Sequence, residues 1–209
     1  MIRGGTILLV ALVAACGDLV PPARPDPYDV GIRLNDGFEL RFHWTPASLP
    51  VRFWIEPEAN LPTDAAEAIQ AWEAVALLGE FRGVVVADSD AADVLVVRAE
   101  PIDINGNGAT RLDCLGQTEI SVELDTTVTL PFVIELFPRR GASPTSLRSC
   151  LRTTLAHEIG HTLGLFQHSD APDDLMYAPP RVGRPSERDV ASFAALYHSI
   201  PSVRLPAGR

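Results

Sequence analysis

The sequence has no lysine, few cysteines, and no apolar run long enough for a permanent membrane-spanning helix. Its 17 basic residues are all arginine and are outnumbered by 27 acidic residues, so the formal net charge is −10. This excludes nucleic acid as a partner, because phosphate binding needs a basic stripe. We attribute the missing lysine to biased codon usage, which carries no information on mechanism. The 209 residues, 46% of them hydrophobic, can bury one substantial core and predict a single domain.

The first 15 residues predict an export signal. Arg3 precedes a short apolar stretch, Thr6 to Val13, which small residues follow. The run Leu12-Val13-Ala14-Ala15-Cys16 resembles the bacterial lipobox, in which the cysteine is lipid-modified and becomes the mature N-terminus. The alternative is an ordinary cleaved signal peptide that happens to contain a cysteine. We expect residues 1–15 to be the signal peptide of an exported lipoprotein, membrane-anchored through Cys16 in the periplasm or at the cell surface.

The two remaining cysteines predict a disulfide. With Cys16 assigned to the lipid, Cys114 and Cys150 are left as an even pair in a compartment where disulfides persist. The chain-entropy model values their link at roughly 3 to 4 kcal/mol before strain.

Hydrophobic patterning divides the rest of the chain into a tether, a domain and a tail. Residues 16–47 are rich in proline and turn formers and are interpreted as a tether leading into the domain. Residues 48–200 form the predicted domain, and residues 201–209 a C-terminal tail. The expected order of elements is strand, helix, at least three strands and two helices, which predicts an α+β fold with a mixed sheet and a backing helix.

The individual elements are predicted from alternation in strands and from four-residue spacing in helices. Thr63 is the expected N-cap of the first helix, and Gly79 its C-cap. A strand over residues 119–124 is expected to turn Leu124 inward. The remaining expected elements are strands over residues 49–56, 81–87 and 93–99, a helix starting near Thr145 or Ser146, and a helix capped by Ser186 and Asp189.

The second predicted helix contains the pattern His157-Glu158-Ile159-Gly160-His161. Histidines at i and i+4 lie on one helical face and can present ring nitrogens to a single Zn²⁺ ion, while Glu158 projects toward a metal-bound water. Zinc lowers the pKa of that water and polarises a carbonyl, so Glu158 is the candidate general base. Taken alone, the pattern is also compatible with a chance occurrence on a surface helix.

The residues after this pattern resemble those of metzincin metalloproteases and, within them, the matrixins. Gly164 matches the glycine that ends the family's active-site helix, His168 its third ligand and Met176 the methionine of its Met-turn. The resemblance covers about residues 48–198 and is most specific over residues 155–177.

The resemblance implies a metzincin-like zincin domain of the α+β class, with a twisted mixed sheet, a backing helix, an active-site helix, a Met-turn and a C-terminal helix. It also implies a zinc endopeptidase that acts on protein or peptide substrates. The implied metal ligands are His157, His161 and His168, with Glu158 as general base. An extended substrate is expected to pair with an edge strand near residues 108–113.

The chain departs from the family pattern before the third ligand. Three residues separate Gly164 from His168, where the family has two, so strict spacing would place Gln167 at the ligand position. We assign His168, because imidazole is a better zinc ligand than a carboxamide and the turn can absorb one residue. The altered spacing keeps open a lipid-anchored binding or adhesion protein on an inactive metzincin scaffold. A non-proteolytic zinc hydrolase has no supporting motif beyond the two histidines and Glu158.

One catalytic zinc ion is expected and no structural one. Vertebrate matrixins carry several histidines before the active helix, where this sequence has only His43. The segment Asp103 to Gly108 opens like a calcium loop, but Cys114 stands at its twelfth position in place of glutamate, so an EF-hand is rejected. Calcium is therefore possible but unsupported.

Overall fold

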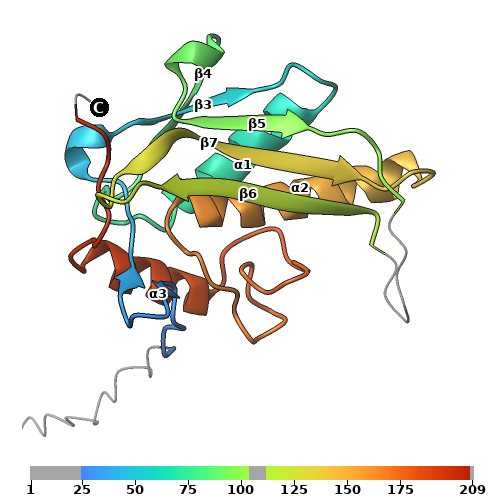
Figure 1. Cartoon of the computed structure of the whole chain (residues 1–209). Helices are drawn as coiled ribbons and strands as arrows, with labels where there is room; N and C mark the ends of the chain where they lie inside the picture. Colours follow the sequence, from blue (N-terminus) through green and yellow to red (C-terminus); the bar gives the residue numbers. More distant parts are fainter. Residues whose placement is uncertain (1–24, 104–111, 208–209) are drawn as a thin grey trace, which may run out of the picture.

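The computed structural model describes residues 25–103 and 112–207 (Figure 1). The predicted signal peptide, the lipid-anchor residue Cys16 and most of the segment compared with a calcium loop lie outside the described residues. Within them the fold is α+β, with a five-stranded mixed sheet and three α-helices, which confirms the predicted class. This architecture is compatible with a metzincin-like domain. No helix in the described ranges is both long and apolar enough to cross a membrane.

From residue 51 on, the strands and helices follow the predicted order along the chain, and two short strands that were not predicted precede them. The strands and α-helices are β1 (Ile32–Arg33), β2 (Glu39–Leu40), β3 (Val51–Ile55), α1 (Leu61–Glu73), β4 (Gly83–Val86), β5 (Val94–Arg98), β6 (Cys114–Val122), β7 (Val128–Pro138), α2 (Pro144–Thr162) and α3 (Glu187–Tyr197). The main sheet has the order β4-β3-β5-β7-β6, and β1 and β2 form a separate hairpin. Parallel ladders join β4, β3, β5 and β7, whereas β6 runs antiparallel to β7 and lies at the edge.

The sheet buries one face against the helices α1 and α2, and α3 lies further from it (Figure 1). In β3, Val51, Phe53 and Ile55 are buried and alternate with half-buried residues, as predicted. Two tryptophans tie α2 to this core. Trp72 of α1 donates its indole N–H to the carbonyl of Ala156, and Trp44 donates to that of Thr162, each at 2.9 Å.

The predicted caps of the first helix are wrong. Helix α1 begins at Leu61, two residues before Thr63, and its N-cap is Asn60. Pro62 fits in the first turn, because the N–H that proline lacks has no partner there. Gly79 has a left-handed φ of +79°, but it lies in the turn that follows the helix end at Glu73.

Strand β7 was not predicted from the sequence, and neither were the short strands β1 and β2 in the predicted tether. Pro131 interrupts the apolar run of β7, yet it lies between Thr129 and Val133, where the pairing with β6 shifts register. A missing N–H is tolerated at such an irregularity. The inward placement of Leu124 is also wrong, because β6 ends at Val122 and Leu124 is fully exposed in the turn before β7.

The packed unit extends beyond residues 48–200 on both sides. In the predicted tether, Phe42 and Trp44 are fully buried, with ring centroids 5.3 Å apart in an edge-on contact. In the predicted tail, Val203 is buried as well. Thus part of both flanking segments belongs to the hydrophobic core.

The two C-terminal helices begin close to the predicted positions. Helix α2 begins at Pro144, one to two residues earlier than expected, and Ser143 caps it with its hydroxyl accepting the N–H of Ser146. In α3, Ser186 and Asp189 form the predicted capping box.

Candidate metal centre

Three histidines converge at the C-terminal part of α2. One ring nitrogen from each of His157, His161 and His168 lies within 4.8 Å of the others. His157 and His161 share one face of α2, because a separation of four residues is about one helical turn. His168 comes from the loop that follows the helix. The structure therefore brings together all three predicted ligands.

Gly164 makes the turn that leads to His168. Helix α2 ends at Thr162, and Gly164 has a φ of +100°, in the left-handed region that favours glycine. A Cβ at this position would overlap the carbonyl oxygen of Phe42. Both the backbone conformation and the close packing thus require glycine, and the predicted helix end is confirmed.

The extra residue before His168 is accommodated in the loop itself. Leu165 is buried, Phe166 is half-buried and Gln167 is exposed. The backbone N–H of Phe166 donates to the carbonyl of Val30 at 2.9 Å, which holds the loop against the N-terminal segment. His168 thereby reaches the other two histidines while Gln167 is exposed to solvent.

Backbone carbonyls orient the two helical histidines. Nδ1 of His157 lies 2.7 Å from the carbonyl oxygen of Leu175, and Nδ1 of His161 lies 2.7 Å from that of Leu165. A protonated Nδ1 that donates to a carbonyl leaves the lone pair on Nε2, the usual arrangement of a histidine that binds a metal.

Burial keeps the histidines neutral. It lowers the pKa of His157 to about 4 and that of His161 to about 3, and it also lowers the pKa of His168. Neutral imidazole is the form that binds a metal, and three imidazoles are a donor set that zinc accepts. The residues present therefore fit a zinc ion.

Glu158 lies beside the cluster and is held by the edge strand. It is only 5% exposed, and the hydroxyl of Thr118 on β6 donates to its Oε2 at 2.7 Å. Burial raises the pKa of Glu158 to about 7, against the opposing effect of this hydrogen bond. Strand β6 and helix α2 can approach this closely because Gly116 has no side chain. A Cβ at this position would overlap Oε1 of Glu158.

Met176 packs directly against the helix that bears the histidines. It is fully buried, and a Cβ on Gly160 would overlap its Sδ atom. The glycine within the histidine pattern is thus required by this contact. The N–H of Ser169 donates to the carbonyl of Met176 at 2.9 Å, so the chain folds back next to the third histidine. The role of Met176 as the Met-turn residue stays a prediction.

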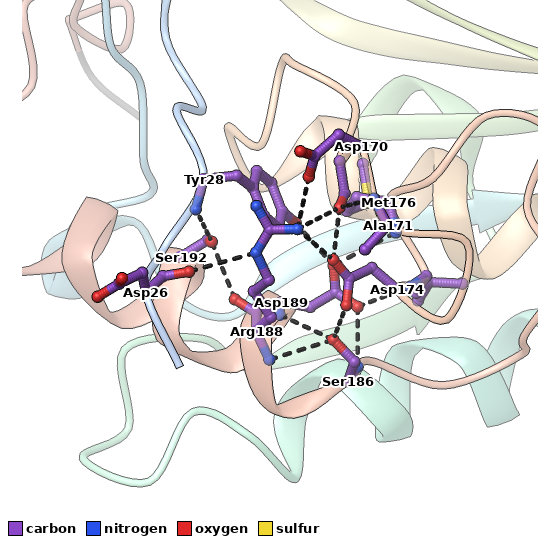
Figure 2. A network of polar contacts seen from close by, with 12 residues as sticks. Asp26, Tyr28, Asp170, Ala171, Asp174, Met176, Ser186, Arg188, Asp189 and Ser192 are labelled. Carbon is purple, nitrogen blue, oxygen red and sulfur yellow. Dashed lines mark hydrogen bonds and ion pairs between the residues drawn. The ribbon is translucent and has the colours of Figure 1, made fainter. Parts of the chain in front are cut away.

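The carboxylate of Asp189 anchors the turn that contains Met176 (Figure 2). It accepts the backbone N–H groups of Leu175 at 2.7 Å and of Met176 at 3.3 Å. The phenol of Tyr28 also donates to it, at 2.7 Å. The first turn of α3 and the N-terminal segment are therefore connected to the residue whose carbonyl orients His157.

A second buried carboxylate, Asp174, holds the chain next to His168 (Figure 2). It accepts a short hydrogen bond from the hydroxyl of Ser169 and one of 2.6 Å from that of Ser186. Arg188 donates to Asp174 at 3.3 Å and to Asp170 at 2.6 Å. This network fixes both ends of the segment from Ser169 to Asp174, which follows His168.

Several of these supporting residues were not predicted from the sequence. Thr118 precedes Glu158 by 40 residues, and no local pattern connects them. Asp189 was predicted only as a helix cap. Asp174 and Arg188 carry no spacing signal that distinguishes them from solvent-exposed charges.

The predicted disulfide is confirmed. It joins Cys114, the first residue of β6, to Cys150 in α2, with a Cα–Cα distance of 5.9 Å. The edge strand expected near residues 108–113 lies mostly outside the described residues, and residues 112–113 are not in a strand. Among the described residues, the edge strand of the main sheet on this side is β6, which begins at Cys114.

The matrixin family model matches residues 142–198, from just before α2 to just after α3. The matched segment contains the three histidines, Glu158 and Met176. No curated protein matches the chain. Together with the histidine cluster, the match supports a matrixin-like family, whose members are zinc-dependent metallopeptidases.

Proposed function

We propose that the protein is a zinc-dependent endopeptidase that hydrolyses peptide bonds. The observation that carries this proposal is the histidine cluster, in which one ring nitrogen of each imidazole lies within 4.8 Å of the others, beside the buried carboxylate of Glu158. His157, His161 and His168 would hold the ion. When bound, zinc lowers the pKa of a water molecule and polarises a carbonyl group.

Glu158 acts as the general base in this proposal. Its carboxylate accepts the proton of the attacking water and later delivers that proton to the departing amine. Burial raises the pKa of Glu158 above its ordinary value, which makes its carboxylate a stronger base than one exposed to solvent. The hydroxyl of Thr118 donates a hydrogen bond to Oε2 of Glu158, which positions the carboxylate for these proton transfers.

The edge strand β6 is the proposed platform for a protein or peptide substrate. Within the described sheet it pairs on one side only, with β7. An extended peptide can add to such an edge through main-chain hydrogen bonds. The chain around residues 177–181 is proposed to form one wall of the pocket beyond the scissile bond.

The alternative is a binding or adhesion protein on an inactive metzincin scaffold. Its basis was the extra residue before His168. Because the loop absorbs this residue and His168 still reaches the cluster, we favour the enzyme.

We also propose that the protein is exported and anchored to the membrane through a lipid on Cys16. The lipobox-like sequence supports this, as does a disulfide that needs an oxidising compartment. Cys16→Ser should release the protein from membranes in cell fractionation. A variant that still fractionates with membranes and keeps residues 1–15 would contradict the anchor.

Proteolysis of an unfolded protein and of a peptide mixture tests the enzymatic proposal. The purified protein should contain one zinc ion per chain and cleave internal peptide bonds. Chelation should abolish cleavage, and added zinc should restore it. A protein that is fully loaded with zinc but cleaves nothing would favour the inactive scaffold instead.

A further inference from the structure

The cleft beside the metal centre contains an apolar region. The whole cleft has a volume of about 350 Å³, and Glu158, His161 and His168 line its catalytic end. Side chains from the edge strand, the N-terminal hairpin and the loop after α2 complete the lining. The apolar ones are Ile32, Leu40, Ile120, Val122 and Phe166.

The apolar region extends along β6 away from the catalytic carboxylate. Thr118 contacts Glu158, and Ile120 and Val122 follow it at alternate positions in the same strand. At about 3.3 Å per residue, these two side chains lie roughly 7 and 13 Å further along the strand. A peptide extended along β6 would pass both before or after it crosses the metal centre.

The hairpin closes this region from the other side. Ile32 and Leu40 are cross-strand partners in β1 and β2, so their side chains lie on the same face. Ile32 is 37% exposed, and Leu40 is half-buried against the core. The hydrogen bond between Phe166 and Val30 fastens the hairpin to the loop that precedes His168.

Charge in the cleft is confined to its catalytic end. Among the described residues that line it, Glu158 is the one acidic side chain, and no arginine lines it. A charged side chain would find no partner beside Ile32 and Phe166, and its desolvation would be costly. The lining therefore favours an apolar occupant.

We propose that Ile32, Leu40 and Phe166 form a subsite that selects an apolar side chain of the peptide substrate. This inference rests on the proposed peptidase function. The occupant is the substrate because the same cleft contains the candidate base and two of the candidate metal ligands. Alternate side chains of a peptide paired with β6 point toward one face, where the hairpin can contact one of them. The extra residue before His168 lengthens the loop from which Phe166 reaches the hairpin.

A set of alanine-based peptides with one leucine moved through the sequence tests the subsite. The natural protein should prefer leucine at one fixed position relative to the cleaved bond, as read by mass spectrometry. Ile32→Ser should lower kcat/KM for that peptide by about tenfold relative to the all-alanine peptide, since the loss is of apolar contact alone. Ile32→Trp should fill the subsite and shift the preference to the all-alanine peptide.

Leu34→Ser provides the matched control. Leu34 follows β1 in the same hairpin and is 42% exposed, but it does not line the cleft. This variant should keep the leucine preference, and all three variants should keep their zinc. Equal effects of Ile32→Ser and Leu34→Ser, or no position of leucine preference, would overturn the subsite while leaving the peptidase function intact.

Binding of the same peptides separates the two proposals if nothing is cleaved. Absence of cleavage would refute the peptidase function. Leucine-dependent binding that Ile32→Ser weakens and Leu34→Ser does not would still support the subsite. Absence of both cleavage and leucine-dependent binding would overturn both.

Discussion

Nδ1 of His157 lies 2.7 Å from the carbonyl oxygen of Leu175, the residue just before Met176. The N–H of Met176, which belongs to the same peptide unit as this carbonyl, donates to the carboxylate of Asp189 at the start of α3 at 3.3 Å, and the N–H of Leu175 donates to it at 2.7 Å. The first candidate ligand is thus oriented by a peptide unit that α3 holds in place. This connection explains why residues far from the histidine pattern should affect metal binding.

Asp189→Asn should weaken zinc binding by up to about 10-fold, the lower end of the range for a lost outer partner of a ligand, because Asp189 acts on His157 through the peptide unit between Leu175 and Met176. Its carboxylate accepts hydrogen bonds from Leu175, Met176 and Tyr28, and an amide cannot satisfy all of them. Competition with a chromophoric chelator measures the affinity. Asp173→Asn, an exposed change in the same turn, should have little effect. Equal affinities of the two variants would contradict this role for Asp189.

His168→Ala should weaken zinc binding by more than the loss of an outer partner does, because a direct ligand is removed. Gln167→Ala should change the affinity little, since Gln167 is exposed in the loop that brings His168 to the cluster. Titration of the metal-free proteins with zinc compares them. The reverse ranking would show that the carboxamide is the third ligand.

Replacing Cys114 and Cys150 together by alanine should lower the free energy of unfolding by roughly 3 to 4 kcal/mol. The disulfide closes the chain across 36 positions and fastens the edge strand to α2. Urea unfolding of the oxidised protein, the reduced protein and the double variant gives the comparison. Two free thiols in the natively exported protein would rule out this contribution.

Gly164→Ala should destabilise the fold more than Gly141→Ala does. Both glycines have positive φ, so alanine costs about 1 kcal/mol or more of backbone strain at either position. At Gly141 a Cβ meets nothing within 4 Å, whereas at Gly164 it overlaps the carbonyl oxygen of Phe42. Thermal unfolding of both variants isolates the packing term. Similar losses would mean that the contact with Phe42 is unimportant.

The sequence predicted the parts of the site that local spacing determines. His157 and His161 follow from one helical turn, and Gly164 from the end of that helix. His168 required a chemical choice between imidazole and carboxamide, because the spacing from Gly164 favoured Gln167. The structure places His168 in the cluster, in agreement with that choice.

The parts that depend on long-range packing were not predicted. Thr118 reaches Glu158 only because β6 lies at the sheet edge beside α2, which no local pattern indicates. Phe42 and Trp44 occur among prolines and turn formers, so their alternation is too short to reveal that they are core residues. Strand β7 was obscured by Pro131, which local rules treat as a strand breaker.

The most direct test of the proposed chemistry is the effect of Glu158→Gln on zinc content and on peptide cleavage, measured on the same preparation. Glutamine preserves the shape of the side chain and its contact with Thr118 but cannot accept the proton. The variant should keep one zinc ion per chain and lose cleavage by about 100-fold or more, the contribution expected of a general base. Unchanged turnover, or loss of zinc from the variant, would contradict the assignment of Glu158 as the base that acts beside the metal.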